Sequence, residues 1–360
     1  MSPFLSFIAL ALPALVAVAT SPAPGAIVVD SSNTPWIQGA GDVVNDTGME
    51  ISNDATAEIR AGASVTLSGS LIVGQRTWSG RLSQLIASGG DLTTGWMNVC
   101  NKAMGDAYLK FSGATVQTGG MTIASAVAGK GGDSIDMLHS AGSVTVTGNG
   151  ELRIGSSYAA PTSTPVIQWT QTGGDFSYAG KWMQIGLLAD NTATYTISGG
   201  TFLQSKSHGD FWGLQVGGSA GEGTGTFHVD GWWDVPGVDK EIDLRGGGTR
   251  VGEQGTLKFS IHDANGTTLI NVTDVDAANM LGTVDMDLVG YTPAMGETFD
   301  LITGAANYGS LTLAGDDADA WSLCTSGETL QATYLVPDPA SLMLLALGAA
   351  LMKRRGGSAA

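Results

Sequence analysis

The chain is poor in cysteine, in basic residues and in proline, and these shortages exclude whole classes of protein. Among 360 residues it has 2 Cys, 11 Pro and 16 Lys+Arg against 33 Asp+Glu, so its formal net charge is −17. Two cysteines cannot form a disulfide framework. An acidic chain also lacks the basic face that nucleic-acid binding requires, so we expect no nucleic-acid partner.

Glycine and apolar residues are what the chain has in quantity. The 53 glycines follow no triplet period, which excludes a collagen-like helix. Hydrophobic residues make up 43% of the chain, which is enough to bury a large core and excludes wholesale disorder. This composition favours a β-rich chain with many tight turns.

An apolar stretch from Phe4 to Ala19 lies near the start of the sequence, followed by the turn-forming segment SPAPGA. Ala17-Val18-Ala19 has the small-x-small pattern that signal peptidase accepts, so we interpret residues 1–26 as an export signal and a turn-rich segment. The first basic residue is Arg60, so only the α-amino group supplies positive charge before the apolar stretch. A buried N-terminal helix is the alternative interpretation.

Residues 336–360 combine a proline-rich tetrapeptide, a thirteen-residue apolar run and a basic cluster, in that order. These are Val336, Pro337, Asp338 and Pro339, then Ala340–Met352, then Lys353, Arg354 and Arg355. Thirteen helical residues span about 20 Å, which is less than the roughly 30 Å of a bilayer core. Because the basic cluster would stop translocation, we expect transient membrane anchoring.

This arrangement resembles the PEP-CTERM sorting signal, also called an ice-binding-protein C-terminal domain. In that family a Pro-Glu-Pro motif precedes a short hydrophobic helix and an Arg-rich end. Pro337 and Pro339 match the motif, while Asp338 replaces the glutamate and keeps the carboxylate. The resemblance implies that the membrane enzyme exosortase recognises and processes the tail.

The middle of the chain repeats two short motifs. The first is apolar-x-apolar-small, whose final residues are separated by 26, 55, 31 and 31 positions, so the gap of 55 indicates two units with one degenerate copy. Its copies end at Gly74, Cys100, Gly155, Gly186 and Gly217. The second is Ser/Thr-Gly-Gly, which begins at Ser88, Thr118, Thr172 and Ser198.

Such repeats, with an internal alternation of period two, indicate stacked coils of short strands. We predict an all-β fold in which residues 27–245 form a parallel β-solenoid with coils of about 25–31 residues. After about Gly246 the strand spacing changes, so residues 246–335 are predicted to form a smaller antiparallel β module that caps the solenoid. An antiparallel sandwich is the alternative. The repeat style resembles autotransporter-like β-strand repeat proteins, which often carry PEP-CTERM signals.

Few residues stand in patterns that carry catalysis or bind metal. The four histidines, His139, His208, His228 and His262, form no HxH or HExxH motif, and no Cys-x-x-Cys occurs. Cys100 stands where the other repeats have glycine, so we interpret it as a corner residue rather than a nucleophile.

Carboxylates are the remaining candidates, because enzymes built on parallel β-helices use Asp and Glu with Ca²⁺ or in pairs. The candidates are Asp133 with Asp136, and the trio Asp316, Asp317 and Asp319. Asp133 ends a partial GGxGxD calcium motif, which needs stacked copies to complete a site. The trio is typical of a solvated loop tip. We therefore expect no metal site, no cofactor and no catalysis.

Trp96 and Trp182 each stand four residues before the small residue that ends a repeat. By alternation they share a face with Asn98 and Gln184, opposite apolar neighbours that would point inward. Outward indoles beside amides suit glycan binding, because sugar C–H groups stack on the ring while hydroxyls bond the amides. A loop that covers both rings is the alternative.

Together these features predict an exported, structural or adhesive protein, first membrane-associated and then held at the cell surface or in the extracellular matrix. Its partners would be signal peptidase, an exosortase-like enzyme and a surface polysaccharide. A polysaccharide-binding or polysaccharide-degrading β-helix is one alternative, and an ice-binding surface is another. Ice binding requires a flat, regular array of threonines, and segments such as Thr192–Thr196 look too irregular across the repeats to favour it.

Overall fold

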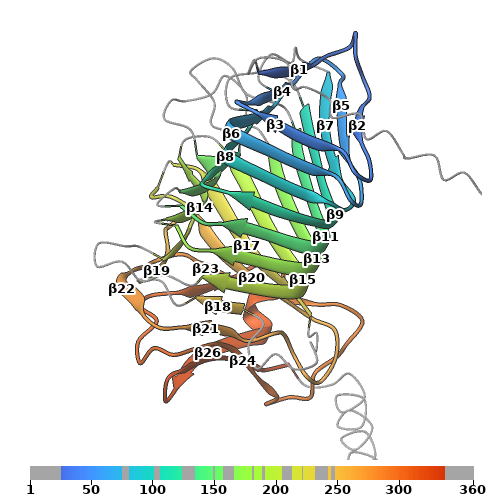
Figure 1. Ribbon diagram of the computed structural model, residues 1–360. Coiled ribbons are helices and arrows are strands. Elements are labelled where there is room, and N and C mark those ends of the chain that lie inside the picture. Colours follow the sequence, from blue (N-terminus) through green and yellow to red (C-terminus); the bar gives the residue numbers. More distant parts are fainter. Residues whose placement is uncertain are drawn as a thin grey trace, which may run out of the picture.

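A computed structural model shows short strands wound into one long parallel β-solenoid (Figure 1). The structure describes residues 26–74, 81–100, 106–123, 134–148, 151–156, 166–180, 182–188, 191–204, 213–220, 222–231, 242–244 and 248–336. Each coil contributes strands to three faces, which we call faces A, B and C in the order in which the chain visits them. The predicted parallel β-solenoid is confirmed.

Face A carries the first strand of each coil. It consists of β2 (Trp36–Gln38), β5 (Thr56–Ile59), β7 (Leu82–Ala87), the first parts of β9 (Asp106–Thr118), β11 (Ser134–Val146), β13 (Val166–Tyr178) and β15 (Thr192–Gln204), then β17 (Thr224–Asp230), β20 (Gly255–Ile261), β23 (Thr283–Leu288) and β25 (Thr312–Ala314).

Face B follows it within each coil. It consists of β3 (Val43–Asp46), the first parts of β6 (Ser64–Val73) and β8 (Asp91–Val99), the second parts of β9, β11, β13 and β15, then β18 (Ile242–Leu244), β21 (Ile270–Val272) and β24 (Thr298–Thr303).

Face C closes the coil. It consists of β1 (Ile27–Val29), β4 (Met49–Ile51), the second parts of β6 and β8, then β10 (Met121–Ile123), β12 (Leu152–Ser156), β14 (Met183–Leu188), β16 (Leu214–Val216), β19 (Thr249–Val251) and β22 (Val275–Met280).

The core is a set of apolar columns that run along the solenoid axis. Because alternate residues of a strand point to opposite faces, each coil sends every second side chain inward onto its equivalent in the next coil. Behind face A, Trp169, Tyr195 and Phe227 stack in register, with ring centroids 5.1 and 5.7 Å apart. Behind face B, Phe176 and Phe202 lie 5.0 Å apart. All five rings are buried, so the stack is held by continuous apolar burial.

Glycines make the corners between faces A and B. Gly90, Gly174 and Gly200 have φ values of +74°, +75° and +87°, a left-handed conformation that glycine adopts without steric cost. A Cβ on Gly200 would lie 2.1 Å from the carbonyl oxygen of Gly174 in the preceding coil. Three Ser/Thr-Gly-Gly motifs therefore mark one corner. The copy that begins at Thr118 instead lies between faces B and C.

The apolar-x-apolar-small motif forms the strands of face C. Its final residues, Gly74, Cys100, Gly155, Gly186 and Gly217, all have positive φ. Cys100 has φ +49° and is buried, as expected of a corner residue, and burial raises the pKa of its thiol to about 12. The 55-residue gap contains β10, whose Met121 pairs with Met97 below and Leu152 above. It is the degenerate copy that the spacing predicted.

The change from parallel to antiparallel pairing comes later than Gly246. Strands β20, β23 and β25 continue face A in parallel register, so parallel pairing extends into the segment that was predicted to pair antiparallel. Antiparallel pairing joins β24 to β27 (Thr329–Tyr334), and β27 to β26 (Trp321–Ser326), beside the short 3₁₀ helix η1 (Ala318–Ala320). Phe299, Trp321 and Tyr334 form its aromatic core. The antiparallel module is therefore real but smaller than expected.

Both predicted targeting segments fall largely outside the described residues. The described residues begin at 26 and end at 336. Residues 1–25 and 337–360, with the apolar run Ala340–Met352, therefore lie outside them. Among the residues that are described, no helix has the length and apolar character needed to cross a bilayer.

Candidate functional site

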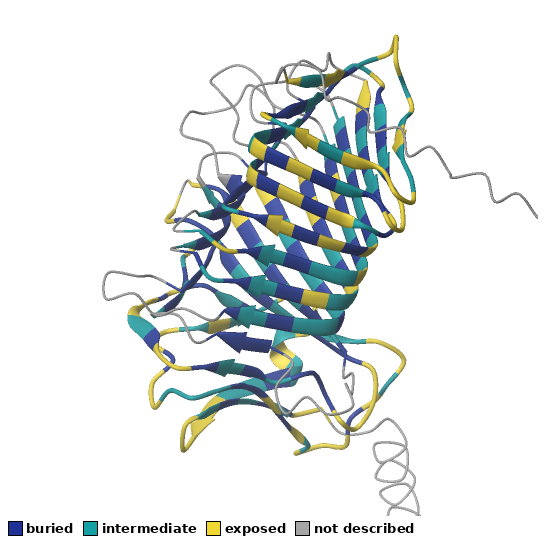
Figure 2. Ribbon diagram, in the orientation of Figure 1, coloured by how far each residue is buried: buried dark blue, intermediate teal, exposed yellow. Residues whose placement is uncertain are grey.

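The outward side of face B presents two columns of short polar side chains that run in register across successive coils. Figure 2 shows the alternation of buried and exposed positions along these strands. The first column is Val43, Ser64, Asp91, Thr115, Ser143, Asp175 and Thr201, and the second is Asn45, Thr66, Thr93, Gln117, Thr145, Ser177 and Leu203. We call the residues from Ser64 to Ser177 in these columns the polar array.

The polar array is regular because the backbone sets its spacing. Neighbouring coils lie about 4.8 Å apart, and residues two apart on a strand lie about 6.8 Å apart. Its members are hydroxyls, one amide and the carboxylates of Asp91 and Asp175, and each is exposed or half-buried. Thr201 donates to Asp175 across neighbouring coils at 2.6 Å. The array thus offers repeated hydrogen-bonding groups, without a basic or an aromatic side chain among them.

Face A carries a different surface over its C-terminal half. Five threonines stand in one outward column: Thr194, Thr226, Thr256, Thr283 and Thr312. The hydroxyls of Thr256 and Thr283 lie 3.0 Å apart. We call this column the threonine ladder. The threonines are irregularly spaced along the sequence, but coil stacking brings these five into register.

A charged column lies beside the threonine ladder. His228, Lys258 and Asp285 occupy equivalent positions in three successive coils. Lys258 Nζ lies 3.3 Å from Asp287 and 3.8 Å from Asp285. Burial raises the pKa of Asp285 and lowers the pKa of His228, and the nearby Lys258 and carboxylates modify both shifts. His228 Nε2 lies 2.8 Å from the buried Ser260 hydroxyl.

Trp96 and Trp182 lie in one column of face C, but two coils separate them. Their apolar neighbours Met97 and Met183 point inward and are buried, as the alternation predicted. The Trp96 ring occupies the space above Gly120, where a Cβ would lie 2.4 Å from it, and its Nε1 donates to Thr122 Oγ1 at 3.3 Å. Both indoles are half-buried. They therefore do not form one continuous platform.

The carboxylate candidates that the structure describes fall at two places. Asp136 is exposed on face A, whereas Asp133 lies outside the described residues. Asp316, Asp317 and Asp319 are exposed at the turn around η1, as expected of a loop tip. Among the described residues, no group of three His, Cys, Asp or Glu side chains is placed to hold a metal ion.

The remaining sequence candidates are also scattered. His139 is buried in the core and His208 lies outside the described residues, while His262 pairs with Asp230 at 2.8 Å on the surface. Cys100 is buried and Cys324 is exposed, and both are free thiols. Of the sorting tail, only Val336 is described, and it is 38% exposed. Pro337, Asp338, Pro339 and the basic cluster lie outside the described residues.

The polar array and the threonine ladder are the two surfaces that sequence reasoning missed. Both are made of ordinary polar residues at outward strand positions, so no local motif marks them, and only the pairing register between coils reveals the columns. Comparisons of the chain with protein-family models, curated proteins and solved structures find no match.

Proposed function

We propose that this is an exported structural or adhesive protein whose polar array contacts an extended polysaccharide at the cell surface or in the extracellular matrix. The parallel β-solenoid is compatible with such a role. The proposal includes no catalytic step and no cofactor.

The observation that carries the proposal is the regular spacing of the polar array along face B. Serine and threonine lose little side-chain entropy when they bind, so many weak contacts can add up. A linear polysaccharide repeats its hydroxyls along its length, and a ligand that engages several coils at once gains avidity from each further contact. The two carboxylates and the absence of basic side chains from the array favour a neutral polymer over an acidic one.

Export and retention rest on the two ends of the sequence. The apolar segment Phe4–Ala19 supports cleavage by signal peptidase, and the order Val336–Pro339, Ala340–Met352 and Lys353–Arg355 supports processing by an exosortase-like membrane enzyme. Deleting residues 337–355 is expected to release a folded protein into the medium. Pro337→Ala with Pro339→Ala should leave an unprocessed, membrane-bound form. Parent-like localisation and migration of both variants would contradict the sorting role.

The polysaccharide contact is tested by affinity electrophoresis or sedimentation with neutral insoluble polymers. Thr93→Val with Thr145→Val removes two hydroxyls from the polar array and keeps the β-branched shape of both side chains. The loss of two hydrogen bonds should weaken retention by about tenfold. The matched control is Thr226→Val with Thr256→Val on face A, which should retain parent affinity. Equal retention of all three proteins would count against the polar array.

The threonine ladder favours ice as a second candidate ligand. Its methyl and hydroxyl groups repeat at each coil, and the neighbouring pair Thr192 and Thr224 extends the array in the second dimension. Regularly repeated threonines are the feature of an ice-binding surface that the ladder supplies. Inhibition of ice recrystallisation by the parent protein, lost in Thr226→Val with Thr256→Val, would support it. Inhibition that is absent, or that survives this substitution, would exclude the ladder as an ice-binding surface.

A further inference from the structure

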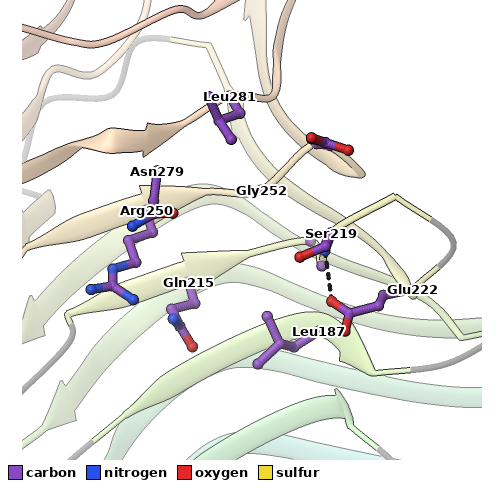
Figure 3. A pocket seen from close by; sticks show the side chains of 11 residues that line it. Leu187, Gln215, Ser219, Glu222, Arg250, Gly252, Asn279 and Leu281 are labelled. Atoms are coloured by element: carbon purple, nitrogen blue, oxygen red, sulfur yellow. Dashed lines mark hydrogen bonds between the residues drawn. The ribbon is translucent and has the colours of Figure 1, made fainter.

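A small pocket opens on face C, at the corner that leads to face A. It encloses about 240 Å³. Its walls come from four successive coils and include Leu187, Gln215, Glu222, Arg250, Glu253 and Leu281 (Figure 3). Gln215 and Arg250 occupy equivalent positions on the neighbouring strands β16 and β19, while Glu222 and Glu253 stand on the turns that follow those strands.

Gln215 supplies an oriented amide donor to this pocket. Its side-chain oxygen accepts a hydrogen bond from Gln184 Nε2 at 3.0 Å, which fixes the direction of the amide. The residue is only 9% exposed, yet it lines the pocket, and no acceptor for its Nε2 is found among the described residues. An amide that is already held in place can donate to a ligand oxygen at a low entropic cost.

The neighbouring polar groups are fixed in place by their own contacts. Arg250 pairs with Asp276 at 2.6 Å, and Asn279 donates to the same carboxylate at 3.0 Å. Glu222 accepts from the Ser219 backbone N–H at 2.6 Å, and Glu253 accepts from that of Ala220 at 3.1 Å. The polar groups are therefore preorganised, which lowers the entropic cost of binding.

Charge and size restrict the ligand. The pocket lining includes the guanidinium of Arg250, which is paired with Asp276, and the carboxylates of Glu222 and Glu253, so the charge balance disfavours an anion. The pocket is smaller than the roughly 300 Å³ at which drug-sized sites begin. Leu187 and Leu281 add apolar wall to the pocket, and Leu281 is 43% exposed. A single sugar ring combines this size with both apolar C–H and hydroxyl surfaces.

We propose that the pocket binds one neutral hexose unit, at the end or a branch of a glycan. The inference extends the proposed polysaccharide contact, on which it rests for the choice of ligand. In this arrangement Gln215 donates to a ring hydroxyl, the glutamates accept from others, and Leu281 covers a C–H face of the sugar.

The test is saturation-transfer NMR on the full protein with glucose, galactose, mannose and N-acetylglucosamine, and with galacturonate as the anionic comparison. At least one neutral sugar should bind saturably with a dissociation constant in the millimolar range, and galacturonate should bind more weakly. Gln215→Leu should weaken binding at least tenfold. Because that change also removes the acceptor for Gln184, Leu281→Ala at the exposed rim serves as a second variant, expected to weaken binding a few-fold in a folded protein.

The array variant Thr93→Val with Thr145→Val is the matched control and should bind the monosaccharide as the parent does. Absence of saturable binding by every neutral sugar, or parent-like binding by both pocket variants, would overturn the proposal. Retention on insoluble polysaccharide, measured separately, reports the polar array. Loss of one activity with survival of the other therefore identifies which of the two proposals has failed.

Discussion

Faces A and B are built by the same strands, yet they present different surfaces. Strands β9, β11, β13 and β15 each run along face A, turn at the corner and continue along face B. Their inward side chains are buried on both sides of the corner and are mostly apolar, with Thr118, His139, Gln171 and Gln204 as buried polar exceptions. Outward, face B carries the polar array, whereas the C-terminal half of face A carries the threonine ladder beside a column of charges.

The difference shows that packing between coils constrains only the inward side chains of each strand. An inward residue must match those above and below it, because interiors are closely packed. An outward residue meets only its equivalents in neighbouring coils, so it can vary with little effect on the stack. Binding surfaces can therefore differ between two faces of one strand, provided that the corner between them is preserved.

Substitution of a corner glycine should lower the unfolding free energy most, because both faces depend on the corner. Gly200→Ala combines left-handed strain with a Cβ placed 2.1 Å from a carbonyl oxygen, and should cost about 2–5 kcal/mol of unfolding free energy. Gly41 lies at the equivalent corner of an earlier coil, also with φ +87°, but nothing stands within 4 Å of its Cβ position. Gly41→Ala should cost only about 1–2 kcal/mol. Urea denaturation of both variants measures the difference, and equal costs would show that close approach of the coils is unimportant.

These corners also show what sequence could and could not predict. Local chemistry marked the Ser/Thr-Gly-Gly turns and the Gly or Cys of five strands of face C, so the solenoid was predictable. The threonine ladder was not, because its members are separated by 32, 30, 27 and 29 positions. Insertions at the corners change the spacing, and only backbone pairing restores the register. Likewise, the local pattern of β20 and β23 indicated strands but carried no information on parallel or antiparallel partners.

A second test concerns the buried imidazole of His139, which lies close to the corner between faces A and B. His139 is buried in register between Phe111 and Gln171, and burial lowers its pKa from the ordinary 6.5, against the opposing effects of the Gly142 backbone and Asp175. The unfolded chain therefore binds a proton more readily than the folded one. Stability is fully present above pH 6.5 and falls as the pH drops below it, by up to about 1.4 kcal/mol per pH unit for each such group.

His139→Leu should therefore reduce the loss of stability between pH 7 and pH 5, measured by urea denaturation at each pH. His228, whose pKa is also lowered by burial, remains in this variant and accounts for a residual slope. Replacing both histidines should flatten the profile further. If His139→Leu loses stability in acid as the parent does, then protonation of the buried His139 does not cause that loss. The outward charges of face A would then be the next candidates for its cause.

Removal of one of those outward charges should change the unfolding free energy least. Lys258 is 30% exposed and lies between Asp285 and Asp287, in a setting where ion pairs contribute about 0–1 kcal/mol. Lys258→Met keeps most of the apolar stem and should lower the unfolding free energy by less than about 1 kcal/mol at pH 7. Burial already raises the pKa of Asp285, with Asp287 and Asp316 acting in the same direction, so its ionised form is disfavoured in the folded state. Losing Lys258 raises that pKa further, and the stability difference from the parent should disappear in acid, where Asp285 is protonated in both states. A loss of several kcal/mol of unfolding free energy, or a loss that persists at pH 3, would mean that Lys258 packs into the stack. The outward residues of face A would then be constrained, in contrast to those of face B.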